Sequence, residues 1–176
     1  LFNFMKESSL IGFSRGDFTG SSFHAVNPAT GVGLGVDYVH ASEAELNRAC
    51  ELAQQASLSM ASLSGKEKAD FLRSLADLID GAVDELVEIM PKETGLPEGR
   101  VRGEAGRTSG QLRMFGNLVE EGSWVDARID RANPDRQPLP KPDLRAMLRP
   151  VGPVAVFCAS NFPLAFSVAG GDVCLL

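Results

Sequence analysis

Residues 151–166 read Val-Gly-Pro-Val-Ala-Val-Phe-Cys-Ala-Ser-Asn-Phe-Pro-Leu-Ala-Phe. The apolar run over residues 154–159 is typical of a strand that is buried on both faces of a parallel sheet. A polar corner at Ser160 and Asn161 follows this run, and Pro163 favours the start of a helix directly after it. A strand that ends in a corner and opens a helix is the first half of a β-α-β unit, so the stretch predicts an α/β fold.

Asn161 stands where open α/β sheets bind their ligands, beyond the carboxyl end of the strand. Its side-chain amide can donate a hydrogen bond to an oxygen that gains negative charge during a reaction. Asparagine is also common in turns and helix caps, and spacing alone favours this structural role. Both interpretations therefore stay open on the residues of the corner alone.

Three helical segments precede the corner. Ser42 and Ser64 each open a Ser-x-x-Glu capping box, and Pro97 suits the first turn of a third helix. Pro91 is expected to kink or end the second helix, which Gly95 then caps. Apolar residues recur at helical spacing in all three segments, so we expect each helix to present one apolar face to a core.

Extended segments lie on both sides of these helices. Residues 23–40 predict a pair of strands joined by the turn formers at 27–31. Residues 124–130 and 144–149 alternate in polarity, and the prolines between them predict an extended, non-helical link. This second pair is therefore expected to form a ribbon that projects from the body.

The composition argues against several classes of function. Lys and Arg number 17 against 23 Asp and Glu, which gives a net charge of -6, and no basic stripe offers a surface for nucleic acid. No run reaches the roughly 18 apolar residues that cross a membrane. The 2 histidines and 3 cysteines show no metal-ligand or disulfide-framework spacing, so we expect no metal site and a cytoplasmic location.

The corner closely resembles the segment of aldehyde dehydrogenases that carries their oxyanion-binding asparagine, which corresponds to Asn161. Residues 27–31 are similar to a turn near the N-terminus of the same family. One branch, the 2,5-dioxovalerate (α-ketoglutarate semialdehyde) dehydrogenases, is similar in further motifs, so that the resemblance spans about residues 5 to 172. These motifs are Gly95-Leu96-Pro97, Glu104-x-x-Arg107-Thr108-x-x-Gln111-Leu112-Arg113, Pro134-Asp135-Arg136 and the stretch from Asn161 to Asp172.

The resemblance implies the N-terminal part of an aldehyde dehydrogenase fold. Its expected parts are a hairpin with three helices, an oligomerisation ribbon, and the first strand and helix of a Rossmann-like NAD(P) domain, over residues 1–123, 124–150 and 151–176. The implied enzyme oxidises α-ketoglutarate semialdehyde to 2-oxoglutarate with NAD or NADP, as a homo-oligomer joined through the ribbon. Within it, Asn161 holds the oxyanion and Phe162 forms a wall of the aldehyde pocket, while the residues along the cofactor are Phe157, Cys158, Ala159 and Ser160.

Arg107 and Gln111 are candidates for binding the substrate. An enzyme that forms a dicarboxylate must hold the remote carboxylate of its substrate, and arginine does this well. The two residues are four apart on the expected third helix, so they can share one face. The alternative, favoured on residue type alone, is a solvated or salt-bridged surface.

The family's nucleophilic cysteine, general-base glutamate and cofactor-binding lysine lie beyond the matched segment. Residues 173–176 depart from the family pattern, so the chain is expected to be an N-terminal fragment that is inactive alone and binds cofactor poorly. The alternative is a non-catalytic helical module that binds or assembles with a partner.

Cys158 does not read as the missing nucleophile, although it lies three residues before Asn161. A reactive thiol needs a base or a positive field, and no histidine is nearby in the sequence. We therefore expect Cys158 to pack or to line the cofactor site, and Cys50 to lie in the core on the apolar face of the first helix. Cys174, in the divergent tail, supports no inference.

Overall fold

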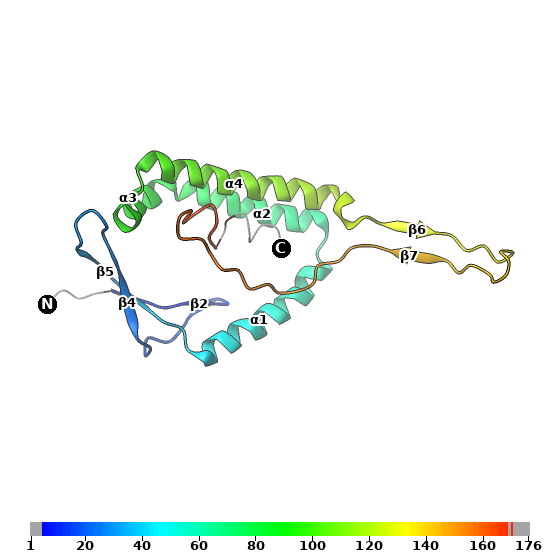
Figure 1. Cartoon of the computed structure of the whole chain (residues 1–176), viewed down its shortest axis with the longest axis horizontal. Coiled ribbons are helices and arrows are strands. Elements are labelled where there is room, and N and C mark those ends of the chain that lie inside the picture. The colour runs from blue at the N-terminus through cyan, green and yellow to red at the C-terminus, as the bar shows by residue number, and fades with distance from the viewer. Residues whose placement is uncertain (1–4, 169, 171–176) are drawn as a thin grey trace.

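Two long antiparallel helices form the body of the molecule (Figure 1). The structure is a computed structural model that describes residues 5–168 and 170. The two helices are α2 and α4, which the shorter α3 connects, over Gly65–Gly81, Glu98–Glu121 and Val83–Thr94.

Helices α2 and α4 approach each other closely because small residues line their contact. Ala69 and Ala76 of α2 are fully buried, and a side chain at Gly65 would collide with the carbonyl group of Val119 on α4. Leu112, which is 2% exposed, packs with Ala76 at the centre of the contact. The surrounding side chains are Leu72, Leu75, Ile79 and Phe115. This interface is the main hydrophobic core of the described residues.

Ion pairs cross the same interface at its rim. The Nη2 atom of Arg113 on α4 lies 2.6 Å from Oδ1 of Asp77 and 2.8 Å from Oδ2 of Asp80, both on α2. The hydroxyl group of Ser109 and the guanidinium of Arg113 lower the pKa of Asp80. Because these groups are partly exposed, the pairs contribute little free energy and mainly favour one alignment of the two helices.

Both predicted capping boxes are confirmed. The Ser42 hydroxyl accepts the Glu45 N–H at 3.2 Å, and the Glu45 carboxylate accepts the Ser42 N–H at 2.8 Å. Ser64 and Glu67 exchange the same two bonds. These bonds satisfy backbone donors that have no partner within the helix, so they fix the starts of α1, Glu43–Ser62, and α2.

The single helix expected between Ser64 and Pro91 is divided in two, which corrects that prediction. Helix α2 ends at Gly81, and α3 begins after Ala82, so the described residues form four α-helices rather than three. Glycine is about 1 kcal/mol less favourable than alanine inside a helix, which makes Gly81 a natural place for the break. The apolar stripe continues through the break, and periodicity alone therefore could not reveal it.

The end of α3 follows the prediction at Gly95 and departs from it at Pro91. The helix continues past Pro91 to Thr94, whose hydroxyl donates to the Met90 carbonyl at 2.6 Å. Gly95 then ends it in the left-handed conformation with φ of 72°, which glycine adopts without strain. Pro97 serves as the N-cap of α4 rather than as a residue of its first turn.

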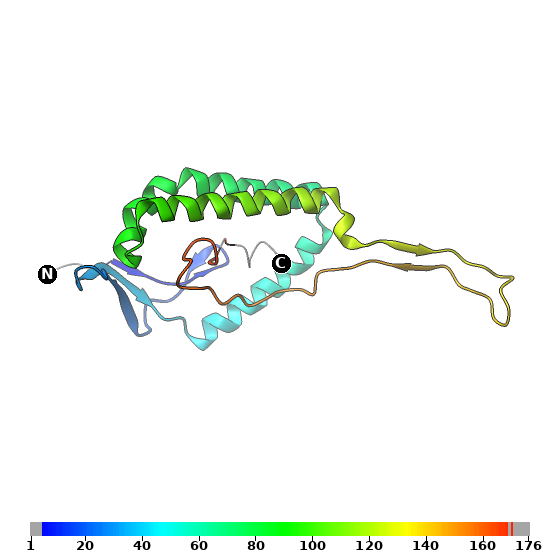
Figure 2. The ribbon, with the colours of Figure 1, turned by 45° about the horizontal axis from the view of Figure 1, so that its top comes forward.

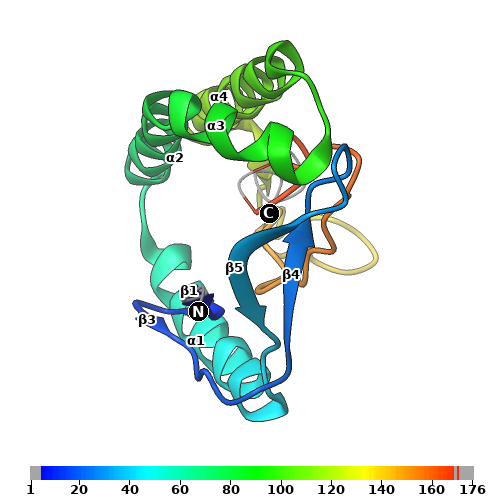
Figure 3. The same cartoon turned by 90° about the vertical axis from the view of Figure 1, so that its left-hand side faces the viewer.

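A small sheet and α1 lie on the other side of the molecule from α2, α3 and α4 (Figure 3). Strand β5, Gly33–Val39, pairs in parallel with β1, Met5–Glu7, and antiparallel with β4, Ser22–Val26. The predicted turn at residues 27–31 closes the β4–β5 hairpin, with the Gly31 N–H bonded to the Asn27 carbonyl at 2.8 Å. The predicted strand pair is therefore confirmed.

A short hairpin and one side-chain contact complete this region. Strands β2, Leu10–Ile11, and β3, Ser14–Arg15, pair antiparallel. The Tyr38 hydroxyl donates to the Glu93 carboxylate at 3.3 Å and so links β5 to α3. Burial and the charge of Glu93 raise the pKa of Tyr38, which keeps this donor protonated.

Helix α1 has no buried residue. Cys50 is exposed, which corrects the expectation that it lies in the core. Leu46 and Leu58 are 60% and 69% exposed along the same helix. An apolar stripe predicts burial only where another element covers it, and the described residues do not cover this one.

The expected ribbon forms and projects far from the body (Figures 1 and 2). Strands β6, Arg128–Asp130, and β7, Leu144–Ala146, pair antiparallel, and a bridge joins Asn133 to Lys141 beyond them. The first strand begins later than predicted because Ser123–Val125 forms a 3-10 turn after α4.

Residues 154–159 do not form the expected buried strand. They have no strand partner among the described residues, and Phe157 is 91% exposed. A strand is stable only when neighbouring strands bond its backbone groups. The apolar composition of this run predicted burial, but it does not provide the neighbouring strands. Cys174, like all of residues 171–176, lies outside the described part of the chain. None of the helices that the described residues form is long and apolar enough for a membrane crossing.

Candidate functional site

The corner at residues 159–166 folds into one compact turn. The Ala159 N–H donates to the Phe166 carbonyl at 2.9 Å, and the Phe166 N–H donates to the Phe162 carbonyl at 3.0 Å. Pro163 begins a single helical turn here rather than the longer helix that was expected. Because the segment bonds to itself in this way, Asn161 sits on a backbone with a defined path.

A carboxylate from α4 caps this turn. The Oε2 atom of Glu104 accepts the backbone N–H groups of Leu164 at 3.1 Å and Ala165 at 3.3 Å. Glu104 is 4% exposed and Ala165 is 1% exposed. The contact joins residues 60 and 61 positions apart, so it docks the corner on the face of α4.

Two arginines of α4 complete the contact with the corner. Arg100 donates from Nε to Oε1 of Glu104 at 2.7 Å and from Nη2 to the Asn161 carbonyl at 3.3 Å. Its guanidinium carbon lies 4.4 Å from the centre of the Phe162 ring. The guanidinium carbon of Arg107 lies 4.8 Å from the Phe166 ring centre and 5.9 Å from that of Phe162. Such cation–π contacts stabilise the stacked arrangement of charge and ring.

The side chain of Asn161 is exposed at this corner. The turn that follows it begins at Phe162, whose carbonyl accepts the first bond and whose side chain cannot accept backbone N–H groups. Here Glu104 accepts the bonds of Leu164 and Ala165 instead. No hydrogen bond between described residues involves the Asn161 side chain, and Glu104 supplies the cap of the turn.

The four residues predicted along the cofactor precede Asn161 on the same segment. Phe157, Cys158 and Ser160 are exposed, and Ala159 is half-buried. None of the four carries the charge that would pair with a pyrophosphate, which would need other groups.

The structure brings Arg107 to the corner beside Phe162. Gln111 follows Arg107 by one turn of α4 and is half-buried. Arg113, on the same helix, instead pairs with Asp77 and Asp80 of α2. The salt-bridged part of the alternative therefore describes Arg113, whereas Arg107 is exposed and fits the solvated part as well as a place in the site.

Sequence reasoning missed Glu104 and Arg100 as parts of the site. One signal was present, because Glu104 interrupts a buried stripe of α4 that includes Val101, Ala105 and Thr108. A carboxylate in such a stripe costs free energy unless donors reach it. Its position therefore pointed to a hidden partner, although the sequence did not identify which segment supplied one.

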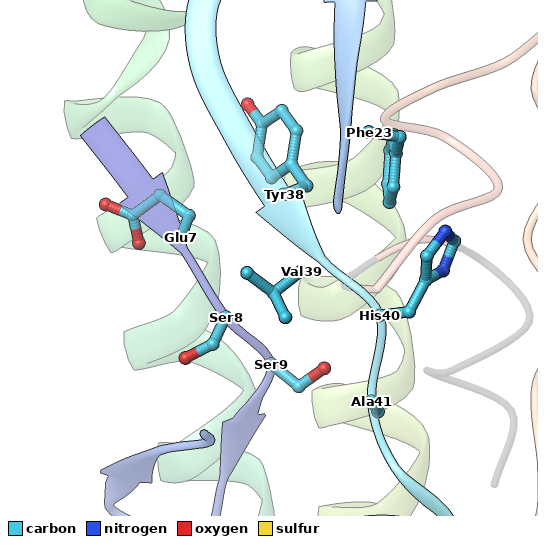
Figure 4. Close-up of a pocket in the computed structure, with 8 residues that line it drawn as sticks. All are labelled: Glu7, Ser8, Ser9, Phe23, Tyr38, Val39, His40 and Ala41. Carbon is cyan, nitrogen blue, oxygen red and sulfur yellow. The ribbon is translucent and has the colours of Figure 1, made fainter. Parts of the chain in front are cut away.

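A separate hollow of about 320 Å³ lies on the sheet (Figure 4). The rings of Phe23 and His40 lie at its edge with their centres 4.9 Å apart and their planes tilted by 36°. The other lining residues are Glu7, Ser8, Ser9, Tyr38, Val39 and Ala41. It contains no residue predicted for the site. Within residues 5–168 and 170, no group of three or more His, Cys, Asp or Glu side chains is arranged to hold a metal ion.

The sequence matches a known family over most of its length. Residues 17–174 match the sequence model of the aldehyde dehydrogenase family. Alpha-ketoglutaric semialdehyde dehydrogenase 2 of Azospirillum brasilense is 44% identical over 164 residues, which are 93% of this chain and 31% of that protein. Alpha-ketoglutaric semialdehyde dehydrogenase of Acinetobacter baylyi is 50% identical over 128 residues, or 73% of this chain and 24% of that protein.

Solved structures share the fold. An Escherichia coli NADP-dependent enzyme and PnpE in complex with nicotinamide adenine dinucleotide each match with a TM-score of 0.64 and 24% identity. Each match covers 73% of this chain and 26% of the other. The predicted mixed α/β fold is thereby confirmed, and the chain spans about a quarter to a third of the length of its curated relatives.

Proposed function

The chain belongs to the aldehyde dehydrogenase family, and from this premise we propose that it provides the oxyanion-binding corner of a semialdehyde dehydrogenase. The whole enzyme would oxidise α-ketoglutarate semialdehyde to 2-oxoglutarate with NAD or NADP. The names of the two curated relatives support this choice of substrate. The observation that carries the proposal is the docked corner, which leaves the Asn161 side chain exposed while Glu104 caps the turn.

Asn161 would act on the oxygen of the aldehyde. When a nucleophile adds to the carbonyl carbon, this oxygen gains a negative charge, and the Asn161 amide N–H would donate to it. A donor whose backbone is already fixed needs little reorganisation as the charge develops. NAD or NADP, when bound, supplies the acceptor for the hydride of the aldehyde. The residues that would hold it here are Phe157, Cys158, Ala159 and Ser160.

Arg107 and Gln111 would bind the remote carboxylate of the substrate. The guanidinium face of Arg107 lies over the rings of Phe166 and Phe162. Its N–H donors lie in the plane of the group, so stacking leaves its edge to meet a carboxylate. Gln111, one turn further along α4, would add a neutral donor, and Phe162 would form the wall of the pocket.

The ribbon would join subunits of a homo-oligomer. It projects from the body, and Ile129, Leu139 and Leu144 expose 66%, 68% and 55% of their surface. Unpaired strand edges with exposed apolar side chains favour pairing with another chain. This supports the proposed division into residues 1–123, 124–150 and 151–176, of which 1–4, 169 and 171–176 lie outside the described part.

A chimaera tests the proposed function. The matched segment of the Azospirillum brasilense relative is replaced by the corresponding residues of this chain, which are 44% identical. We expect the chimaera to reduce NAD or NADP with α-ketoglutarate semialdehyde, and the isolated 176-residue chain to show no turnover. A chimaera that folds and binds cofactor but oxidises no aldehyde would overturn the proposal. Turnover by the isolated chain would contradict the placement of the nucleophile outside it.

Replacing Arg107 by glutamine tests the carboxylate site. In the chimaera we expect the KM for α-ketoglutarate semialdehyde to rise about tenfold or more, because a charge-assisted bond is lost. The KM for propanal, which has no carboxylate, should stay the same. Arg102→Gln is the matched control, since Arg102 lies on the same helix and pairs with Glu98 and Asp84. Equal KM values for the semialdehyde before and after the change would remove Arg107 from the site.

A further inference from the structure

We propose that Glu104 and Arg100 act as positioning residues that hold the Asn161 corner ready for oxyanion binding. We call this pair the corner clamp. The inference rests on the proposed function, because it concerns how the oxyanion donor is aimed. Neither residue would touch the substrate, so their effect would pass through the backbone and side chain of Asn161.

The first argument concerns the cap of the turn that follows Asn161. The turn that follows it has two backbone donors, at Leu164 and Ala165, while Pro163 has no N–H to satisfy. Oε2 of Glu104 accepts both donors, at 3.1 and 3.3 Å. Phe162 holds the N-cap position, because its carbonyl accepts the first bond of the turn, from the Phe166 N–H, and its side chain has no oxygen to accept these donors. Glu104 supplies the acceptor that Phe162 lacks, so it caps the turn directly after Asn161 and leaves the Asn161 side chain without a role in the cap.

The second argument concerns the environment of Glu104. Its neighbours in the stripe, Val101 and Ala105, are fully buried, and Glu104 itself is 4% exposed. A buried carboxylate costs free energy unless it is fully hydrogen-bonded. Three donors reach it, two from the corner and one from Arg100. The buried carboxylate therefore needs the donors of the docked corner, and the corner needs the carboxylate as its cap. This mutual dependence favours one position of the corner on α4.

The third argument concerns Arg100. Its guanidinium bonds to Oε1 of Glu104, donates to the Asn161 carbonyl and lies over the Phe162 ring. One planar group thus contacts the cap, the backbone of the donor residue and the expected wall of the pocket. A planar, multidentate cation suits this task, and lysine could not reproduce it.

Helix α4 also carries a second Arg–Glu ion pair, which does not contact the corner and can serve as a control for the corner clamp. Arg102 donates from Nε to Oε1 of Glu98 at 2.8 Å, with the same i to i+4 spacing as the corner clamp. Glu98 keeps 59% of its side chain exposed, compared with 4% for Glu104. Glu98→Gln therefore makes the same chemical change on the same helix, away from the corner.

Amide hydrogen exchange on the 176-residue chain tests the clamp itself. Glutamine offers one acceptor where glutamate offers two, so Glu104→Gln leaves either the corner or Arg100 without a partner. We expect exchange at Leu164 and Ala165 to become about tenfold faster or more, and Glu98→Gln to leave it unchanged. Unchanged exchange in a folded Glu104→Gln chain would overturn the clamp. If circular dichroism shows that this variant unfolds, Arg100→Gln replaces it. We then expect faster exchange at Phe162 and Leu164, and unchanged exchange would again count against the clamp.

Activity of the chimaera tests the positioning role. We expect Glu104→Gln to lower kcat about 10- to 100-fold with little change in the KM for the semialdehyde, because oxyanion binding acts in the transition state. In an Asn161→Ala background, the same change should have almost no further effect, since residues that act through one group are not additive. Additive losses would overturn action through Asn161, and so would an unchanged kcat alongside faster exchange. An inactive parent chimaera would refute the proposed function and the positioning role with it, while the exchange data still decide whether the clamp exists.

Discussion

Asn161→Ala is expected to lower the kcat of the chimaeric enzyme about 100- to 1000-fold, the usual loss on removing one oxyanion donor. The physical reason is that the amide N–H interacts more strongly with the oxyanion than with the neutral carbonyl. The KM for the semialdehyde should change little. The fold should also survive, because Asn161 is exposed and its side chain makes no hydrogen bond among the described residues.

Steady-state kinetics with each variant measures this loss. Asn47→Ala is the control, because Asn47 is an exposed asparagine on α1 that has no place in the corner. Asn161→Asp adds a sharper comparison, since a carboxylate keeps the shape of the side chain but repels an oxyanion. A rise in KM with kcat unchanged would mean that Asn161 binds the substrate without stabilising the transition state.

Leu112→Ala is expected to destabilise the chain by about 2–5 kcal/mol, which is the usual range for a buried leucine. Leu112 is 2% exposed and fills the contact between α4 and Ala76 of α2. The truncated side chain would leave a cavity between two helices that small residues already hold close together. Domains of this size commonly unfold at a cost of about 5–15 kcal/mol, so the change removes a large part of their stability.

Urea unfolding followed by far-ultraviolet circular dichroism measures this loss of stability. One cooperative helical signal reports on α2 and α4 together. Leu118→Ala is the matched control, because Leu118 lies on the same helix and is 41% exposed. We expect its effect to stay below about 1 kcal/mol. Equal losses for the two variants would show that the α2–α4 contact is not the main core.

Local signals predicted the starts of α1 and α2 and the end of α3. The two Ser-x-x-Glu boxes and Gly95 depend only on residues within a few positions, and the structure places all three as expected. The break at Ala82 was missed because the apolar stripe runs through it. Cys50 was misplaced because a stripe on α1 does not say whether another element covers it.

The candidate site was predictable only in part, for the same reason. The motif around Asn161 pointed to a corner, and the structure forms one there. The apolar run before it was assigned to a strand, but strand formation depends on neighbours that no local pattern contains. Glu104 was missed because its partners lie 60 and 61 positions away, where neither helical nor strand periodicity can reach.

The distant cap on the corner has a consequence for the order of folding. The ends of α2 and α4 meet through contacts that close a helical hairpin, whereas the Glu104 contact must also close a loop that contains the whole ribbon. Loop closure of this length costs chain entropy before any bond repays it. During synthesis, moreover, α4 leaves the ribosome before the corner is made. We therefore expect α4 to act as a preformed template, on which Asn161 is set in place as one of the last events of folding.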